Sequence, residues 1–160
     1  MKRISIILAV VLLLLLAFTY MFIPNRITVS ENITISVNRE AIFRKLGDTT
    51  EWQKWWPGEK RDLAAKHSFT LNGFRYSLDD KKILSLPISI SNQIFKALTE
   101  LTFISENTDE STLSLNGVIP TSYNPIRRIQ LFFTANKIKK DITTLLQSIK
   151  SYYSTTSSLY

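Results

Sequence analysis

An apolar stripe at helical spacing runs through residues 124–153, and it constrains the fold more than any other feature of the sequence. Its members recur at intervals of three and four: Leu131, Ala135, Ile138, Ile142, Leu145, Ile149 and Tyr152. This spacing predicts one long amphipathic helix from Asn124 to Tyr153. The residues expected to face water are Lys137, Lys139, Lys140, Asp141, Gln147 and Lys150. Because a single helix cannot bury such a stripe, the rest of the chain must provide the surface that covers it.

The segments before this helix alternate between apolar and polar residues, as half-buried strands do. We predict strands at residues 26–37, 67–71, 74–78, 82–91, 93–106 and 111–119. In the first strand the alternation slips near Glu31, which indicates a bulge. Asn72-Gly73, between the second and third strands, predicts a tight hairpin.

Two short helices are expected between the first and second strands. Asn38 is a suitable N-cap for a helix that begins at Arg39, and Gly47 ends it. Asp48 or Thr49 then caps a second helix through Trp56. The predicted fold class is therefore α+β, with a curved antiparallel sheet around a long C-terminal helix.

The N-terminal segment from Ile4 to Ile23 is almost wholly apolar. Roughly 20 residues at about 1.5 Å each match a hydrocarbon core of about 30 Å, so the segment is long enough to span a membrane. A cleaved secretory signal is the alternative, because Lys2 and Arg3 precede the apolar run. We predict an uncleaved anchor over residues 1–25, with the N-terminus in the cytoplasm and the domain facing the periplasm or cell exterior.

Composition excludes several classes of site. The chain has no cysteine, which excludes disulfides, thiolate metal sites and a thiol nucleophile. Its single histidine and four scattered glycines provide neither a histidine zinc site nor a phosphate loop, so we expect no metal and no cofactor. The net charge of +7 includes Lys2, Arg3 and Arg26 beside the apolar segment. The other basic residues are expected on solvated faces, and we do not expect nucleic acid as a partner.

Over residues 26–153 the chain resembles the START-like, polyketide cyclase/dehydrase superfamily (SRPBCC). The resemblance rests on the order of elements and on three segments: NREAIF at 38–43, WQKWWP at 52–57, and residues 145–150. It implies a helix-grip fold, in which the sheet wraps around the C-terminal helix and encloses an apolar cavity. Some members bind lipids, sterols or polyketides, a few are cyclases, and many are uncharacterised. The apolar N-terminus also resembles membrane-anchored bacterial members with a following effector-binding domain, which makes residues 154–160 a tail or a linker remnant.

The predicted ligand pocket is apolar and largely aromatic. We expect it to be lined by Trp52, Trp55, Trp56, Phe69, Tyr76, Phe95, Phe103, Ile138 and Ile142. The same residues would equally serve as plain core packing, with no ligand.

Three functions are compatible with these features. The first is a membrane-anchored domain that binds a small hydrophobic or amphipathic molecule, such as a lipid, without chemistry. The second is a cyclase- or hydrolase-like enzyme that uses His67 or Glu100 as acid or base. The phase of Glu100 along its strand, opposite Leu101 and Phe103, favours the solvent face instead. The third is an interaction or stress-response module whose basic helix face meets anionic lipid or a partner.

Overall fold

The computed structural model describes residues 2–58, 68–80, 82–105, 107 and 109–157. Its helices are α1 (Lys2–Phe22), α2 (Arg39–Leu46), α3 (Thr49–Trp55) and α5 (Pro125–Ser157). Its strands are β1 (Arg26–Ile35), β2 (Ser68–Leu71), β3 (Phe74–Leu78), β4 (Ser85–Ser91), β5 (Lys96–Ser105) and β6 (Ser111–Pro120).

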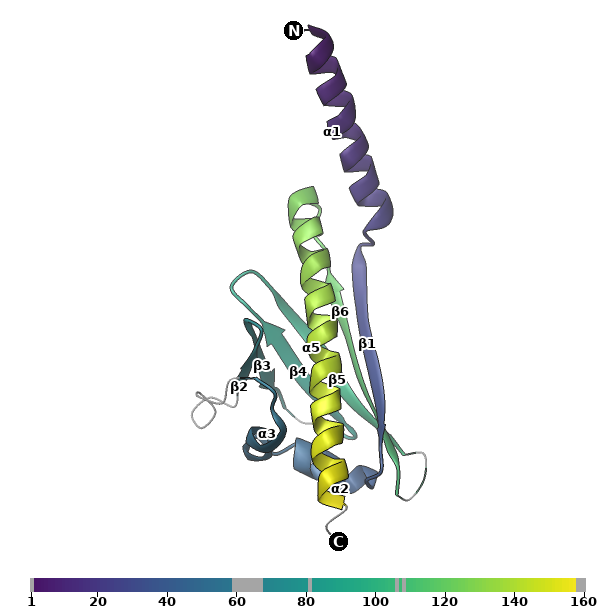
Figure 1. Cartoon of the computed structure of the whole chain (residues 1–160), viewed down its shortest axis with the longest axis vertical. Helices are drawn as coiled ribbons and strands as arrows, with labels where there is room; N and C mark the ends of the chain where they lie inside the picture. Colours follow the sequence, from purple (N-terminus) through teal and green to yellow (C-terminus); the bar gives the residue numbers. More distant parts are fainter. Residues whose placement is uncertain (1, 59–67, 81, 106, 108, 158–160) are drawn as a thin grey trace.

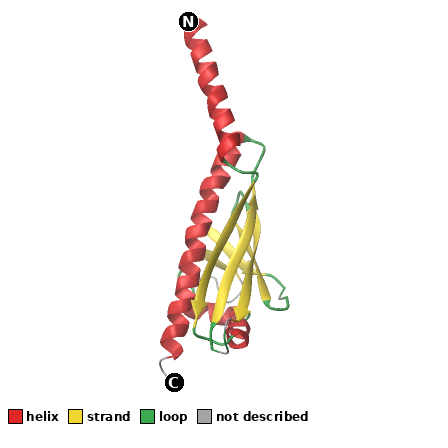
Figure 2. Ribbon diagram, turned by 90° about the vertical axis from the view of Figure 1, so that its right-hand side faces the viewer, coloured by secondary structure: helices red, strands yellow, loops and turns green. Residues whose placement is uncertain are grey.

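Within the described residues these strands form one sheet of six, in the order β1-β6-β5-β4-β3-β2, and every neighbouring pair is antiparallel. Helix α5 lies along one face of the curved sheet (Figure 1; Figure 2). Helices α2 and α3 close the end of the sheet near the C-terminus of α5, and α1 projects from the opposite end. The predicted α+β helix-grip architecture is confirmed.

Helix α5 begins where the sequence predicts, because Asn124 caps it and Pro125 occupies its first turn. The Asn124 side chain accepts hydrogen bonds from the amides of Ile126 and Arg127, at 3.0 and 3.2 Å. The apolar stripe is buried from Leu131 to Ile149, and Tyr153 continues it, while Tyr152 is half-buried.

The prediction that Asp141 faces water is wrong, since only 2% of this residue is exposed. Asp141 follows Ile138 by three residues and precedes Leu145 by four. On a helix those intervals place it beside the buried stripe.

Strand β1 carries no bulge at Glu31. Its register with β6 runs without interruption from Arg26, opposite Pro120, to Ile35, opposite Ser111. Glu31 occupies an inward phase of the strand and meets Lys139 of α5, with 3.5 Å between carboxylate oxygen and ammonium nitrogen. The apparent slip in the sequence was a charged residue that pairs with the helix crossing the strand.

Local signals position α2 and the β2–β3 hairpin as predicted. Asn38 caps α2 by accepting from the amide of Glu40 at 2.9 Å, and Gly47 ends that helix. In the β2–β3 hairpin Asn72 and Gly73 have φ angles of 47° and 82°, and two positive values are what a type I′ turn requires.

Candidate functional site

The space between the sheet and α5, where the sequence predicts a ligand cavity, is filled largely by side chains. The cavity that remains has a volume of about 20 Å³, enough for about one water molecule. It is lined by Leu46, Trp52, Trp55, Trp56, Tyr76, Ile88, Leu101, Leu115, Leu145, Leu146 and Ile149. Pockets for small molecules measure about 300–1,000 Å³, so this cavity is too small for the predicted ligand.

The tryptophans fill this space by packing on one another and on the β2–β3 hairpin. The rings of Trp52 and Trp56 stack with centroids 5.7 Å apart, and Phe69 lies 4.8 Å from Trp52. Each indole N–H in this pair is bonded: Trp52 donates to the carbonyl of Leu46 at 2.7 Å, and Trp56 donates to that of Thr70 at 3.1 Å. The cluster therefore fixes α3 against the hairpin. Trp55 packs in the same cluster, but its indole N–H is buried without a hydrogen-bond partner among the described residues.

Some of the other predicted pocket residues line the same small cavity, and the rest are buried elsewhere in the core. Trp55 and Tyr76 line the cavity. Ile138 and Ile142 are fully buried on the inner face of α5. Phe103 packs edge-on against Phe43 of α2, with ring centroids 5.3 Å apart.

Phe95 is different, because it belongs to a second and larger depression. This side groove lies between the turn from β4 to β5 and the N-terminal half of α5, and its volume is about 300 Å³. Its lining residues are Asn92, Ile94, Phe95, Arg127, Gln130, Leu131, Phe133, Thr134 and Lys137. Among the predicted pocket residues, Phe95 alone is on this wall.

The side groove combines an apolar wall with two cations. Ile94 and Phe133 are exposed, while Phe95 and Leu131 form the buried floor. Arg127 joins the two sides, since its guanidinium donates to the carbonyl of Ile94 at 3.2 Å. Lys137 lines the groove one helical turn beyond Phe133. An apolar surface with a positive rim suits a molecule that has a hydrocarbon portion and an anionic group.

Asp141 forms a polar link between α5 and the β2–β3 hairpin. Its carboxylate accepts a hydrogen bond from the side-chain amide of Asn72 at 2.7 Å and another from the Tyr76 hydroxyl at 3.1 Å. Burial raises the pKa of Asp141 above its usual range, and the two hydrogen bonds oppose that rise. Burial also raises the pKa of Tyr76, as does the neighbouring carboxylate, so the phenol stays protonated as a donor.

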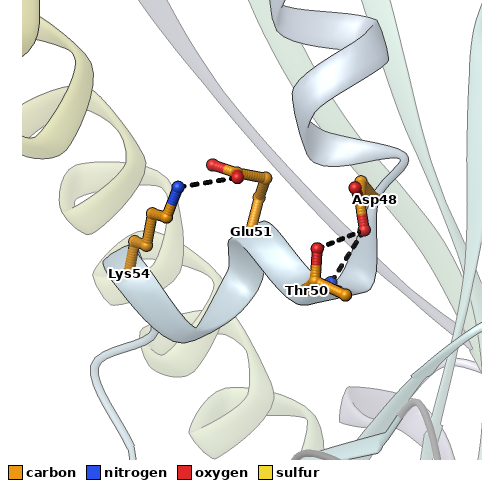
Figure 3. Close-up of polar contacts among 4 residues, drawn as sticks. All are labelled: Asp48, Thr50, Glu51 and Lys54. Atoms are coloured by element: carbon orange, nitrogen blue, oxygen red, sulfur yellow. Dashed lines mark hydrogen bonds and ion pairs between the residues drawn. The ribbon is translucent and has the colours of Figure 1, made fainter.

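A polar groove lies at the other end of α5, beside α2 and α3. Its volume is about 640 Å³, and its lining consists of Asn38, Glu40, Ala41, Arg44, Lys45, Asp48, Glu51, Lys54 and Tyr152. Several charges there already have partners: Lys54 pairs with Glu51 at 2.7 Å, and Asp48 accepts from the amide and hydroxyl of Thr50 (Figure 3). The pairing with Glu51 raises the pKa of Lys54. The acidic and basic side chains that line this groove are equal in number, so it carries no net charge to select a charged ligand.

Glu100 lies on the outer face of the sheet, away from α5. It accepts a hydrogen bond from the Ser85 hydroxyl at 2.7 Å and lies 3.6 Å from the ammonium of Lys82. The Ser85 hydrogen bond is the main cause of its lowered pKa. Glu100 is therefore ionised and outside the core, which corrects the hypothesis of an acid in the cavity. His67 lies outside the described residues, and those residues contain no group of His, Asp and Glu arranged to hold a metal.

Comparison with solved structures finds the same fold. An Aha1 dimer from Colwellia psychrerythraea is 13% identical with a TM-score of 0.56, over 79% of this chain and 96% of that one. A START superfamily protein from Mycobacterium smegmatis is 13% identical with a TM-score of 0.52, over 78% and 97%. A conserved protein from Geobacillus kaustophilus is 13% identical with a TM-score of 0.56, over 81% and 96%.

At this level of identity the similarity establishes a START-like fold and nothing about activity. No protein-family model matches the sequence, and no curated protein matches it significantly.

Sequence reasoning missed both the side groove and the burial of Asp141. One residue of the groove wall belongs to a pattern in the sequence: Phe133 follows Ile126 and Ile129 in a second apolar row at helical spacing, on a side of α5 that the first stripe does not cover. No sequence signal identified the turn from β4 to β5 as the opposite wall.

Proposed function

We propose that this START-like chain is a membrane-anchored binding domain that holds a small anionic amphiphile, such as a fatty acid or lipid, in the side groove. The observation that carries the proposal is the composition of that groove, where Ile94, Phe95, Leu131 and Phe133 surround about 300 Å³ beside Arg127 and Lys137. No bond of the ligand is broken or formed. The alternative of catalysis by Glu100 loses its basis, because that carboxylate is on the opposite face of the sheet.

The groove replaces the central cavity as the binding site for a physical reason. Apolar ligand surface contributes about 25 cal/mol per Å² when it leaves water, so a useful affinity requires room for several carbon atoms. The space of about 20 Å³ among the tryptophans provides none. The side groove provides that room without repacking the core.

Helix α1 supports the membrane anchor. Its segment Arg3–Phe22 is long and apolar enough to cross a bilayer, and none of it is buried against the rest of the protein. An apolar surface of this size would promote aggregation if it were exposed to water. The cytoplasmic position of the N-terminus remains part of the proposal and rests on Lys2 and Arg3.

Photocrosslinking tests the binding site. Full-length protein in phospholipid nanodiscs is irradiated with a diazirine-bearing fatty acid, and the labelled peptides are mapped by mass spectrometry. We expect labelling of residues 92–95 and 127–137. Thr134→Trp should fill the groove and lower that labelling at least fivefold. Asn136→Trp is the matched control, because Asn136 is exposed on the same helix and does not line the groove. Equal labelling of the two variants would refute the groove.

The charge of the ligand is tested separately. Lys137→Gln should reduce crosslinking of the fatty acid and leave that of the corresponding diazirine-bearing fatty alcohol unchanged, because only the acid carries a negative charge. A similar loss for both probes would indicate that Lys137 acts by shape alone.

A further inference from the structure

The end of α1 is attached to the start of α5 by a buried arginine. Only 3% of Arg128 is exposed. Its Nε donates to the carbonyl oxygen of Ile23 at 2.9 Å, and Nη2 donates to the same oxygen and to Oδ1 of Asn25 at 2.9 Å. Its guanidinium also lies 4.9 Å from the ring centroid of Tyr20. A cation at the C-terminal end of a helix is favourable because carbonyl oxygens there have no intrahelical partner.

The loop before α5 is attached to α1 as well. The Tyr20 hydroxyl donates to the carbonyl of Tyr123. The Thr121 hydroxyl donates to the carbonyl of Pro24 at 3.0 Å, and its amide donates to that of Asn25 at 3.0 Å. These bonds hold the beginning of α5 alongside the last turn of α1, as both views show (Figure 1; Figure 2).

This attachment determines what surrounds the first turns of α5. Tyr20 lies within the apolar segment Arg3–Phe22, and its partner Tyr123 is therefore at the level of that segment. Tyr123 is 91% exposed. Ile126, Ile129 and Phe133 follow at intervals of three and four, and they are 69%, 39% and 60% exposed. Together these four side chains form the membrane-end surface, an exposed apolar row.

We propose that the membrane-end surface inserts into the interfacial layer of the same bilayer that α1 spans. The inference rests on the membrane anchor of the proposed function, and the occupant of the surface is lipid. The main support for this insertion is that the surface is continuous with α1, because Arg128 and Tyr20 fix it beside the end of the apolar helix. The exposed cations Arg26 and Arg127 lie at the same end and suit anionic headgroups.

The geometry also gives an order of depth. In Figure 1 the N-terminus of α5 points toward α1 and its C-terminus points away. A rise of about 1.5 Å per residue separates Ile126 from Phe133 by about 10 Å along the helix. Ile126 is therefore the deepest of the three helical residues and Phe133 the shallowest. The side groove, which shares Phe133, opens next to the lipid surface.

Depth-dependent fluorescence quenching tests this placement. Because the chain has no cysteine, single cysteines are introduced by Ile126→Cys, Ile129→Cys and Phe133→Cys and labelled with nitrobenzoxadiazole. The full-length variants are reconstituted in phosphatidylcholine and phosphatidylglycerol vesicles that contain doxyl-labelled lipid. We expect blue-shifted emission, with quenching that falls from position 126 to 133. Lys150→Cys, exposed at the far end of α5, is the matched control and should show neither effect.

Leu12→Cys, in the middle of α1, separates the two hypotheses. Strong quenching at position 12 with none at 126 and 129 would overturn the docking surface and leave the anchor intact. No quenching at position 12 would overturn the membrane anchor itself. Equal quenching at 126 and 133 would contradict the proposed order of depth.

Discussion

The hydroxyl of Tyr76 donates a hydrogen bond to the carboxylate of Asp141 over 3.1 Å, and it thereby joins the sheet to α5 inside the core. Asn72, at the tip of the same hairpin, donates to the other carboxylate oxygen at 2.7 Å. Both donors are neutral, so the charge of Asp141 is buried without a cation among its bonded partners. An ionised carboxylate that is buried without a cation costs free energy in the folded state.

Replacement of Asp141 by asparagine should change how stability depends on pH. The pKa of Asp141 is raised by burial in the folded protein, so the folded state binds the proton more tightly than the unfolded state. The wild type therefore loses stability as pH rises from its unfolded pKa, near 4, through the higher folded value. Asp141→Asn removes this loss and should gain stability relative to wild type over that range.

Urea unfolding of full-length protein in detergent, followed by tryptophan fluorescence at several pH values from 4 to 8, measures this difference. Asp141→Ala is the comparison. It leaves Tyr76 and Asn72 without their buried acceptor and should cost about 1–3 kcal/mol. A difference between wild type and Asp141→Asn that does not vary with pH would contradict the raised pKa.

Gly117 and Thr99 lie opposite each other on β6 and β5, in close contact. A Cβ atom on Gly117 would lie 2.5 Å from Cγ2 of Thr99, so Gly117→Ala should destabilise the protein by about 1–3 kcal/mol. Thr99→Ser removes that methyl group and keeps the hydroxyl that donates to the carbonyl of Ile88 at 2.9 Å. The double variant should therefore be more stable than the sum of the single effects. Additive losses in a double-mutant cycle would exclude this clash.

Gly73 should be sensitive to substitution for a reason of backbone conformation alone. Its φ angle is +82°, and a Cβ atom added there would meet nothing within 4 Å. Gly73→Ala should cost about 1 kcal/mol, and Gly73→Asn less, because asparagine tolerates the left-handed region better. Thermal unfolding of both variants measures the ranking. If alanine proved no worse than asparagine, strain in the turn would not be the cause.

Ile142 should be among the most costly positions to truncate. It is fully buried between α5 and the sheet, and Ile142→Ala should lower the free energy of unfolding by about 2–5 kcal/mol. Lys140→Ala, on the exposed side of the same helix, should change it by no more than about 0.5 kcal/mol. Chemical denaturation of the two variants compares them directly. A small effect at Ile142 would mean that the core is loosely packed there.

Most of the fold was predictable because its signals are local. Asn38, Gly47 and Asp48 each act on backbone groups within a few residues, and the Asn72-Gly73 turn depends on two φ angles. The alternation of β5 likewise indicated that Glu100 faces outward, and the structure agrees. The bulge predicted near Glu31 was wrong because the sequence does not reveal which distant residue meets an inward-facing charge.

The candidate site was much less predictable. Phe95 was among the predicted lining residues, but its neighbours in the side groove come from α5, about thirty-five residues later. The size of the central cavity depends on how the volumes of side chains from different elements add together, and no single segment contains that information.

The sequence by itself determined the elements, the order of the strands along the chain, the apolar face of α5 and the apolar character of α1, because each follows from neighbouring residues and their spacing. Only the tertiary structure decided that the tryptophans close the central space, that Asp141 is buried against Tyr76, and that Arg128 attaches the end of α1 to α5. Each of these depends on contacts between residues far apart in the chain, whose positions are set by the packing of all the elements together.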